Sequence, residues 1–174
     1  MMRILWLSLI LLLNFQPKHE RLMILEKEIT VSGNTSLGKF DCTYNVEGLK
    51  DTLSFVDNKS KDTFLFDIAV ADFGCGNLFL NNDFRKTIKA KEFPKARVKV
   101  TNLRKNKGSY RCDLHLEIAG KRLYFKDFHL NLNDEKLMGY LRLNFDTLGL
   151  DPPRKFGGLV KVDDALYLSL ALVF

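Results

Sequence analysis

The chain has 174 residues, 46% of them hydrophobic and 28% charged, with a formal net charge of +6. This length fits one domain with a substantial core, and this composition excludes an intrinsically disordered chain. The modest positive excess favours contact with acidic surfaces such as anionic lipid head groups and does not require nucleic acid. Phenylalanine is abundant, with 14 residues against one tryptophan, which fits either a plain packed core or a wide apolar lumen.

Residues 1–17 have the features of an export signal. Arg3 supplies a positive charge, and an almost uninterrupted apolar run extends from Ile4 to Leu13. This run has the length of a signal-peptide core, whereas a membrane-spanning helix needs about 20 apolar residues. We therefore expect a signal peptide at 1–17, a mature domain at 18–174, and a location in the periplasm or outside the cell. Because no small-residue cleavage motif precedes Gln16, an uncleaved anchor is the alternative.

Most of the remaining chain shows the alternation of apolar and polar residues that is typical of half-buried strands. The expected strands are Leu22–Val31, Phe40–Val46, Phe64–Val70, Arg97–Leu103, Tyr110–Ile118, Leu123–Leu132, Leu137–Phe145 and Leu159–Phe174. The polar stretch Glu47–Asp62 is expected to be a long connection. Consecutive antiparallel strands with one short helix fit a closed up-and-down barrel, and a two-sheet sandwich predicts nearly the same pattern.

One helix is expected, beginning near Asn81–Asp83, where a side-chain oxygen can accept a hydrogen bond from an early backbone N–H. Phe84 and Ile88 then lie on one side of this helix. Pro94 ends the segment, because the residue before a proline is disfavoured in helical geometry. In the C-terminal strand, Asp163–Asp164 is expected to form a turn. Both faces of the strand after it are apolar or small, which indicates cover on each side or contact with a ligand.

The three cysteines lack the spacing of zinc ligands, and in an exported protein two of them can form a disulfide. Cys112 lies on the apolar side of a regular alternation, so we expect it to be a buried thiol. This favours Cys42 and Cys75 as the disulfide pair. Closing the loop between them would stabilise the fold by about 3–4 kcal/mol.

The sequence contains no GxSxG, HExxH, P-loop or GxGxxG motif, so we expect no enzyme, no cofactor and no metal. A thiol enzyme using Cys75 is a weaker alternative, because a nucleophilic cysteine needs a nearby base and the three histidines are scattered. The basic stretch Arg97–Lys107 lacks the interleaved aromatic residues of single-strand binders, which favours a solvated outer face and no nucleic acid.

Several stretches together resemble the YceI-like family, in particular its shorter members. They are Gly33–Thr35, Phe40–Cys42, Phe66–Asn77, Asn82–Phe84, Ile88–Ala90, Glu92–Pro94, Leu143–Phe145, Pro152–Pro153 and Gly157–Val162. The resemblance implies an all-β fold, an eight-stranded antiparallel lipocalin-like barrel with one short helix. It also implies export to the periplasm and a long apolar tunnel for a polyisoprenoid or similar lipid, and it agrees with pairing of Cys42 and Cys75.

The expected ligand is therefore an apolar lipid such as a polyisoprenoid, held by burial of its surface at roughly 25 cal/mol per Å². An anionic membrane surface is a further expected partner. The candidate ligand-binding residues are Phe64, Phe66, Ile68, Val70, Phe84, Ile88, Leu114, Leu116, Ile118, Leu141, Leu143, Leu168 and Leu170. Because the chain is short for the family, the alternative is a ligand-free structural or interaction barrel of the envelope, with its lumen filled by its own phenylalanines.

Overall fold

The computed structural model describes residues 18–155, 157 and 159–174, so the expected signal peptide at 1–17 lies outside the described residues. The strands are β1 (His19–Thr35), β2 (Gly38–Val56), β3 (Phe64–Ala69), β4 (Lys95–Asn106), β5 (Ser109–Ile118), β6 (Lys121–Asn133), β7 (Lys136–Asn144), β8 (Arg154–Lys155) and β9 (Val160–Val173). The helical segments are the 3-10 turn η2 (Val70–Asp72), the helix α2 (Leu78–Thr87) and the single turn α3 (Phe145–Leu148).

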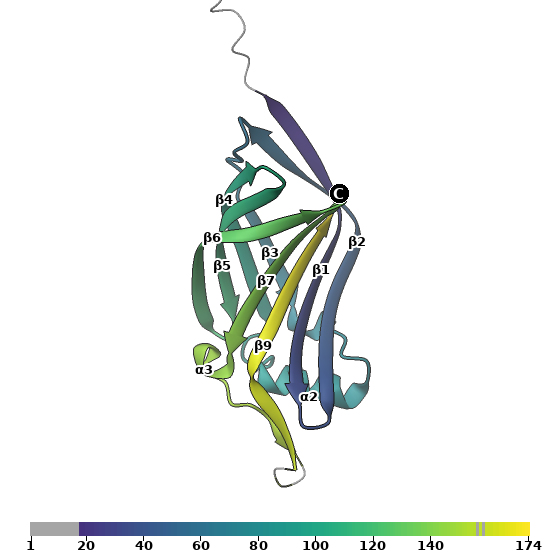
Figure 1. Ribbon diagram of the computed structural model, residues 1–174. Helices are drawn as coiled ribbons and strands as arrows, with labels where there is room; N and C mark the ends of the chain where they lie inside the picture. Colours follow the sequence, from purple (N-terminus) through teal and green to yellow (C-terminus); the bar gives the residue numbers. More distant parts are fainter. Residues whose placement is uncertain (1–17, 156, 158) are drawn as a thin grey trace, which may run out of the picture.

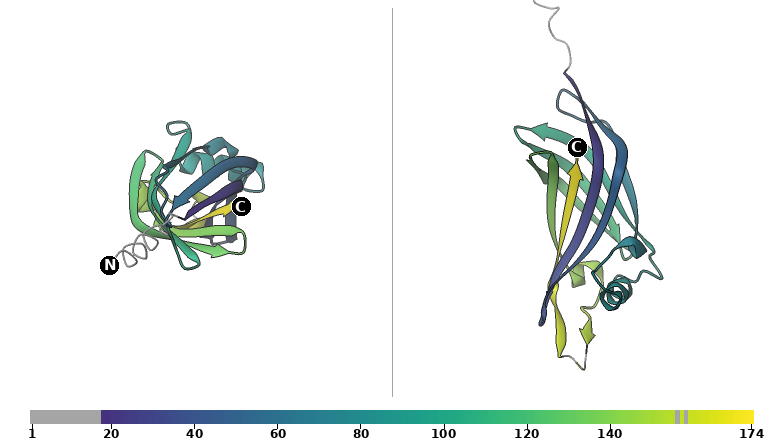
Figure 2. Two further views of the ribbon diagram at one scale, coloured as in Figure 1. Left: turned by 90° about the horizontal axis from the view of Figure 1, so that it is seen from above. Right: turned by 90° about the vertical axis from the view of Figure 1, so that its right-hand side faces the viewer.

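One antiparallel sheet contains all the long strands, in the order β2-β1-β9-β7-β6-β5-β4-β3, with the short β8 paired to β9. The sheet curls around a central axis, so that the strands surround a common interior (Figures 1 and 2). The predicted fold class is therefore confirmed: an all-β, eight-stranded antiparallel lipocalin-like barrel with one short helix. A single continuous sheet excludes the two-sheet sandwich.

Among the described residues, no ladder of strand hydrogen bonds pairs the edge strands β2 and β3, and β2 forms local bridges with residues outside β3 instead. Near α2, the backbone of Thr43 exchanges two hydrogen bonds of 2.9 Å with Gly74. At the end of β2, Val56 forms an isolated bridge with Lys59, three residues further along the chain. These bridges occupy backbone groups that an open sheet edge would leave exposed.

The barrel interior is built by alternation along each strand. On β5, Cys112, Leu114 and Leu116 all face inward and are buried. Cys112 is 0% exposed, which confirms the predicted buried thiol, and burial raises its pKa to about 12. On β9, Leu166 and Leu172 point into the same core. The period of two that the sequence shows therefore does place the apolar residues on one face.

The predicted connection over Glu47–Asp62 is wrong in its first part, because β2 continues to Val56. Leu53 and Phe55, each 1% exposed, pack into the interior while their polar neighbours face outward. Pairing with β1 resumes beyond an irregularity at residues 48–50 of β2, so a stretch with few apolar residues is held in the sheet by its partner strand.

The predicted helix exists, but it begins earlier and ends earlier than expected. Asn77 is the N-cap, and its Oδ1 accepts a hydrogen bond of 3.0 Å from the Leu80 N–H. The expected caps, Asn81–Asp83, lie inside the helix. The helix ends at Thr87, well before Pro94, which instead leads directly into β4.

The predicted turn at Asp163–Asp164 is also wrong, since both residues lie within β9. Asp164 Oδ1 accepts a hydrogen bond of 3.2 Å from the N–H of Phe145, the first residue of α3. A carboxylate in a strand can thus satisfy a backbone group of a neighbouring segment. The local sequence contains no signal for this long-range contact.

Candidate functional site

An apolar pocket of about 110 Å³ lies between α2 and the wall formed by β1, β2 and β9. Figure 1 shows α2 lying across the lower end of the barrel, and the right-hand view of Figure 2 shows the same helix end-on. The pocket is lined by Val31, Thr35, Phe40, Cys42, Leu80, Asp83, Phe84, Thr87, Ile88, Phe145, Pro153, Val160, Val162 and Leu166. Most of this lining is apolar, so the pocket suits a ligand that is held by burial rather than by hydrogen bonds.

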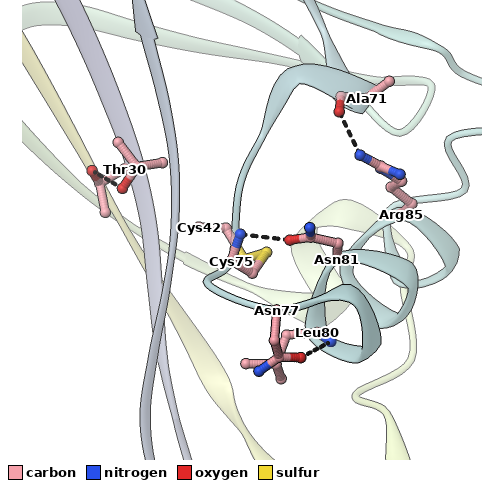
Figure 3. Close-up of a disulfide and its surroundings, with 9 residues drawn as sticks. Thr30, Cys42, Ala71, Cys75, Asn77, Leu80, Asn81 and Arg85 are labelled. Carbon is pink, nitrogen blue, oxygen red and sulfur yellow. Dashed lines mark hydrogen bonds between the residues drawn. A yellow bond between two sulfur atoms is a disulfide. The ribbon is translucent and has the colours of Figure 1, made fainter.

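The position of α2 over the pocket depends on a covalent crosslink and on side-chain hydrogen bonds, which Figure 3 shows. Cys42 of β2 and Cys75 form the predicted disulfide. The Cys75 N–H donates to Asn81 Oδ1 of α2 at 2.6 Å. Arg85 Nη2 donates to the Ala71 carbonyl, also at 2.6 Å. The helix is thereby joined to its preceding loop, and the loop to the barrel wall.

Aromatic packing shapes the pocket further. A Cβ atom on Gly33 would lie only 2.6 Å from two carbons of the Phe40 ring, so glycine at this position of β1 leaves room for that ring in the wall. The Phe73 ring lies 5.7 Å from the Tyr44 ring and 5.4 Å from the Phe84 ring of α2. These contacts hold the helix against β2 at a fixed distance.

The lumen toward the opposite end of the barrel is almost completely filled. Only about 20 Å³ remains there, roughly the space that one water molecule needs. This space is lined by Ile24, Leu53, Phe64, Phe66, Val100, Leu103, Cys112, Leu114, Phe128, Leu130, Leu137, Leu170 and Leu172. This half of the barrel therefore has a self-filled core in place of an open tunnel.

All of the predicted ligand-binding residues belong to the core or pack against it. Phe84 and Ile88 line the pocket. Phe64, Phe66, Leu114 and Leu170 border the small remaining space in the filled half. The others, Ile68, Val70, Leu116, Ile118, Leu141, Leu143 and Leu168, border neither space. Their role in binding a ligand stays a prediction.

Several pocket residues were missed by the sequence analysis. Val31, Phe40 and Leu166 occupy inward positions whose alternation is visible in the sequence. Alternation indicates only that they face inward, and it does not indicate that a helix covers a space in front of them. Leu80 was missed because the predicted start of the helix was misplaced.

Lys27 is a buried charge that points inward from β1, with 6% of its surface exposed. Its Nζ lies 4.3 Å from the Phe66 ring centroid and 5.8 Å from that of Tyr44. Within the described part of the chain, no hydrogen bond or salt bridge joins this ammonium group. Burial lowers the pKa of Lys27, and the Asp51 carboxylate partly opposes this. Along β1, Lys27 separates residues that line the pocket from residues that border the filled lumen.

The described residues contain no cluster of three side chains that could hold a metal ion, and none of their helices is long and apolar enough to cross a membrane. Cys75 is in the disulfide, so it has no free thiol with which to act as a nucleophile. His115 and His129 are exposed on the outer face of the barrel, as was predicted for His115.

The fold and the pocket define an antiparallel lipocalin-like barrel with an apolar site beneath one helix. No family model matches the sequence, and a search of curated proteins finds no match. Solved structures do match the fold. A polyisoprenoid-binding domain from Saccharophagus degradans, described as implicated in plant cell wall breakdown, is 13% identical. The match covers 90% of this chain and 97% of that domain, with a TM-score of 0.55.

Two other solved structures have a similar fold. BcnA from Burkholderia cenocepacia is 16% identical, and the match covers 84% of this chain and 96% of BcnA with a TM-score of 0.52. A YceI protein from Campylobacter jejuni is 13% identical, with 63% of this chain and 70% of that protein covered and a TM-score of 0.50. The chain therefore has the YceI-like fold, as the sequence stretches predicted.

Proposed function

We propose that this protein binds the end of an apolar chain, such as that of a polyisoprenoid lipid, in the pocket beneath α2. The observation that carries the proposal is the pocket itself, which is nearly apolar and lies under a helix fixed by the Cys42–Cys75 disulfide. A cavity of about 150 Å³ with apolar walls can hold one benzene molecule. A space of about 110 Å³ therefore suits a short branched terminus of a lipid. The fold shared with a polyisoprenoid-binding domain supports this ligand class.

The size of the pocket limits how much of the ligand it can bury. Burying about 100–150 Å² of apolar ligand surface contributes roughly 3–4 kcal/mol, whereas micromolar affinity requires about 8 kcal/mol. A short soluble isoprenoid should therefore bind weakly. A long lipid must find further apolar contact for the part of its chain that leaves the pocket, because the lumen beyond is filled.

We also propose that the protein is exported, to the periplasm or beyond the cell, after a signal peptide at 1–17. The Cys42–Cys75 disulfide supports export, because such bonds persist in oxidising compartments. The net charge of +6 supports an anionic membrane surface as a partner.

A ligand-free envelope barrel is the second candidate function. The observation that favours it is the filled half of the lumen, where about 20 Å³ remains. The two candidates differ in a measurable way, because only the first requires an apolar molecule in the pocket.

Titration with geraniol, a soluble alcohol of two isoprene units, followed by calorimetry, distinguishes the two candidates. We expect weak saturable binding to the wild-type protein and at least tenfold weaker binding to Val31→Phe, whose added ring fills the pocket. Val56→Phe is the matched control, since Val56 lies outside the pocket and is exposed. Val162→Phe replaces Val31→Phe if that variant does not fold. Absence of binding to the wild type, or equal binding to both variants, contradicts the proposal.

A further inference from the structure

Strongly exposed apolar side chains lie close in sequence to Thr35, Leu80 and Val160, which line the pocket. Among the described residues, the four most exposed large apolar side chains are Phe79 (84%), Leu159 (81%), Leu37 (79%) and Leu78 (78%). They come from three separate segments: the β1–β2 turn, the start of α2 and the approach to β9. Figures 1 and 2 show these segments at one end of the barrel. We call these four residues the apolar rim.

The rim is continuous with the pocket. The Ser36 N–H donates to the Lys161 carbonyl at 3.0 Å, and Ser36 Oγ donates to the Leu159 carbonyl at 3.1 Å. These bonds hold the β1–β2 turn beside the start of β9. Leu80, which directly follows the two rim residues of α2, lines the pocket together with Thr35. A lipid chain that leaves the pocket therefore meets the rim before it meets water.

We propose that the apolar rim inserts into the interface of a lipid bilayer, so that the pocket opens directly into the membrane. This inference rests on the proposed function, because it assumes that the pocket receives the end of a lipid chain. It also accounts for the small size of the pocket. The remainder of a long chain stays among the lipid tails and does not have to cross water.

The charges around the rim favour an anionic bilayer as the occupant. Exposed basic side chains lie in or next to the three segments that carry the rim. They are Lys39, Lys86, Lys89, Arg154 and Lys161. Cations at this level attract anionic lipid head groups. Exposed leucine and phenylalanine side chains with lysines nearby have the amphipathic pattern of residues that insert into a membrane interface. A second copy of the chain would have to match the lysines with acidic residues.

The test is co-sedimentation with vesicles of equal parts phosphatidylglycerol and phosphatidylcholine. The triple variant Leu37→Ser, Phe79→Ser, Leu159→Ser replaces three of the four rim residues, one in each segment, without changing a pocket residue. We expect its vesicle binding to fall at least tenfold, since each substitution removes apolar surface from the membrane interface.

The matched control carries three serine substitutions at exposed apolar positions on the barrel wall, namely Met23→Ser, Leu65→Ser and Tyr140→Ser. This control should bind vesicles like the wild type, and circular dichroism checks that both triple variants fold. Single substitutions at Leu37 and Leu159 replace the rim variant if it does not fold. Geraniol binding without vesicles should be the same in all three proteins.

Three outcomes overturn this inference, and a fourth separates it from the proposed ligand function. Undiminished vesicle binding by the rim variant overturns it, and so does a wild-type protein that does not bind the vesicles. A concentration-dependent wild-type dimer that the rim variant loses in sedimentation velocity also overturns it, in favour of a second copy of the chain. Vesicle binding that depends on the rim, without geraniol binding, supports docking and contradicts only the proposed ligand function.

Discussion

At the α2 end of the barrel, apolar residues of β1, β2 and β9 surround a pocket of about 110 Å³, whereas in the opposite half residues from all eight long strands leave about 20 Å³. The two halves are built from the same residue types in the same alternation. In the filled half, the rings of Phe64, Phe66 and Phe128 converge on the axis. In the other half, the space is covered by a helix that the disulfide holds at a fixed position. The comparison shows that an inward apolar pattern specifies a core but not its voids.

The largest expected effect comes from emptying the filled half. We expect Phe55→Ala to lower the free energy of unfolding by about 3–5 kcal/mol, because Phe55 is 1% exposed and its ring packs 5.7 Å from that of Tyr110. Urea unfolding measures this, with the exposed neighbour Val56→Ala as the control. A loss below 1 kcal/mol would show that this half is less tightly packed than the structure indicates.

Removing the crosslink tests the other half. The double variant Cys42→Ser, Cys75→Ser is expected to lose about 3–4 kcal/mol of unfolding free energy, because the loop between the two residues is no longer closed in the unfolded chain. Geraniol affinity should fall as well, since α2 is no longer tied to β2. Cys112→Ala, which removes a cysteine outside the crosslink, is the control and should keep geraniol affinity. Unchanged affinity in the double variant would mean that hydrogen bonds alone position the helix.

Lys27 lies between the two halves of the barrel. Lys27→Met should raise the free energy of unfolding by about 1–3 kcal/mol at pH 7, because an apolar chain of similar length replaces a buried unpaired charge. Burial lowers the pKa of Lys27 in the folded protein below its unfolded value of about 10.4. Between these two pKa values the unfolded chain binds more protons, so wild-type stability decreases as the pH falls.

Urea unfolding at pH 7 and pH 10 measures this dependence. The advantage in unfolding free energy of Lys27→Met over the wild type should be smaller at pH 10 than at pH 7. The exposed control Lys99→Met should show the same pH dependence as the wild type. A Lys27→Met protein that is less stable than the wild type at pH 7 would show that the ring contacts of the ammonium outweigh its desolvation.

The smallest effect is expected at Cys112. Burial raises the pKa of this thiol to about 12, and the residue is 0% exposed. In the folded protein at pH 8 it should not react with a thiol reagent, and labelling should follow the rate of unfolding. Rapid labelling of the native protein would indicate that the filled half opens locally.

Much of the fold could be predicted from the sequence. Alternation located the strands of the second half of the chain to within a few residues, and it placed Cys112 in the core, which left Cys42 and Cys75 to pair. The errors occurred where long-range contacts decide the local structure. Residues of β2 before Val56 are strand because β1 pairs with them, and Asp164 lies in a strand because β1 and β7 pair with the residues on either side of it.

The candidate site was less accessible to prediction. Phe84 and Ile88 were identified from helical spacing, but most of the pocket wall was not. Gly33 illustrates the reason. Glycine at this position leaves room for the Phe40 ring, and the two residues are neighbours only because of the register between β1 and β2.

What the sequence determined by itself was the set of inward-facing residues and the absence of catalytic motifs, because a period of two and a motif are local properties of the chain. The tertiary structure decided how the sheet curls, where α2 lies and which half of the lumen stays open. Those features depend on how side chains from strands far apart in the sequence fill one shared interior. A local sequence pattern does not give the total volume of those side chains or the space that they leave.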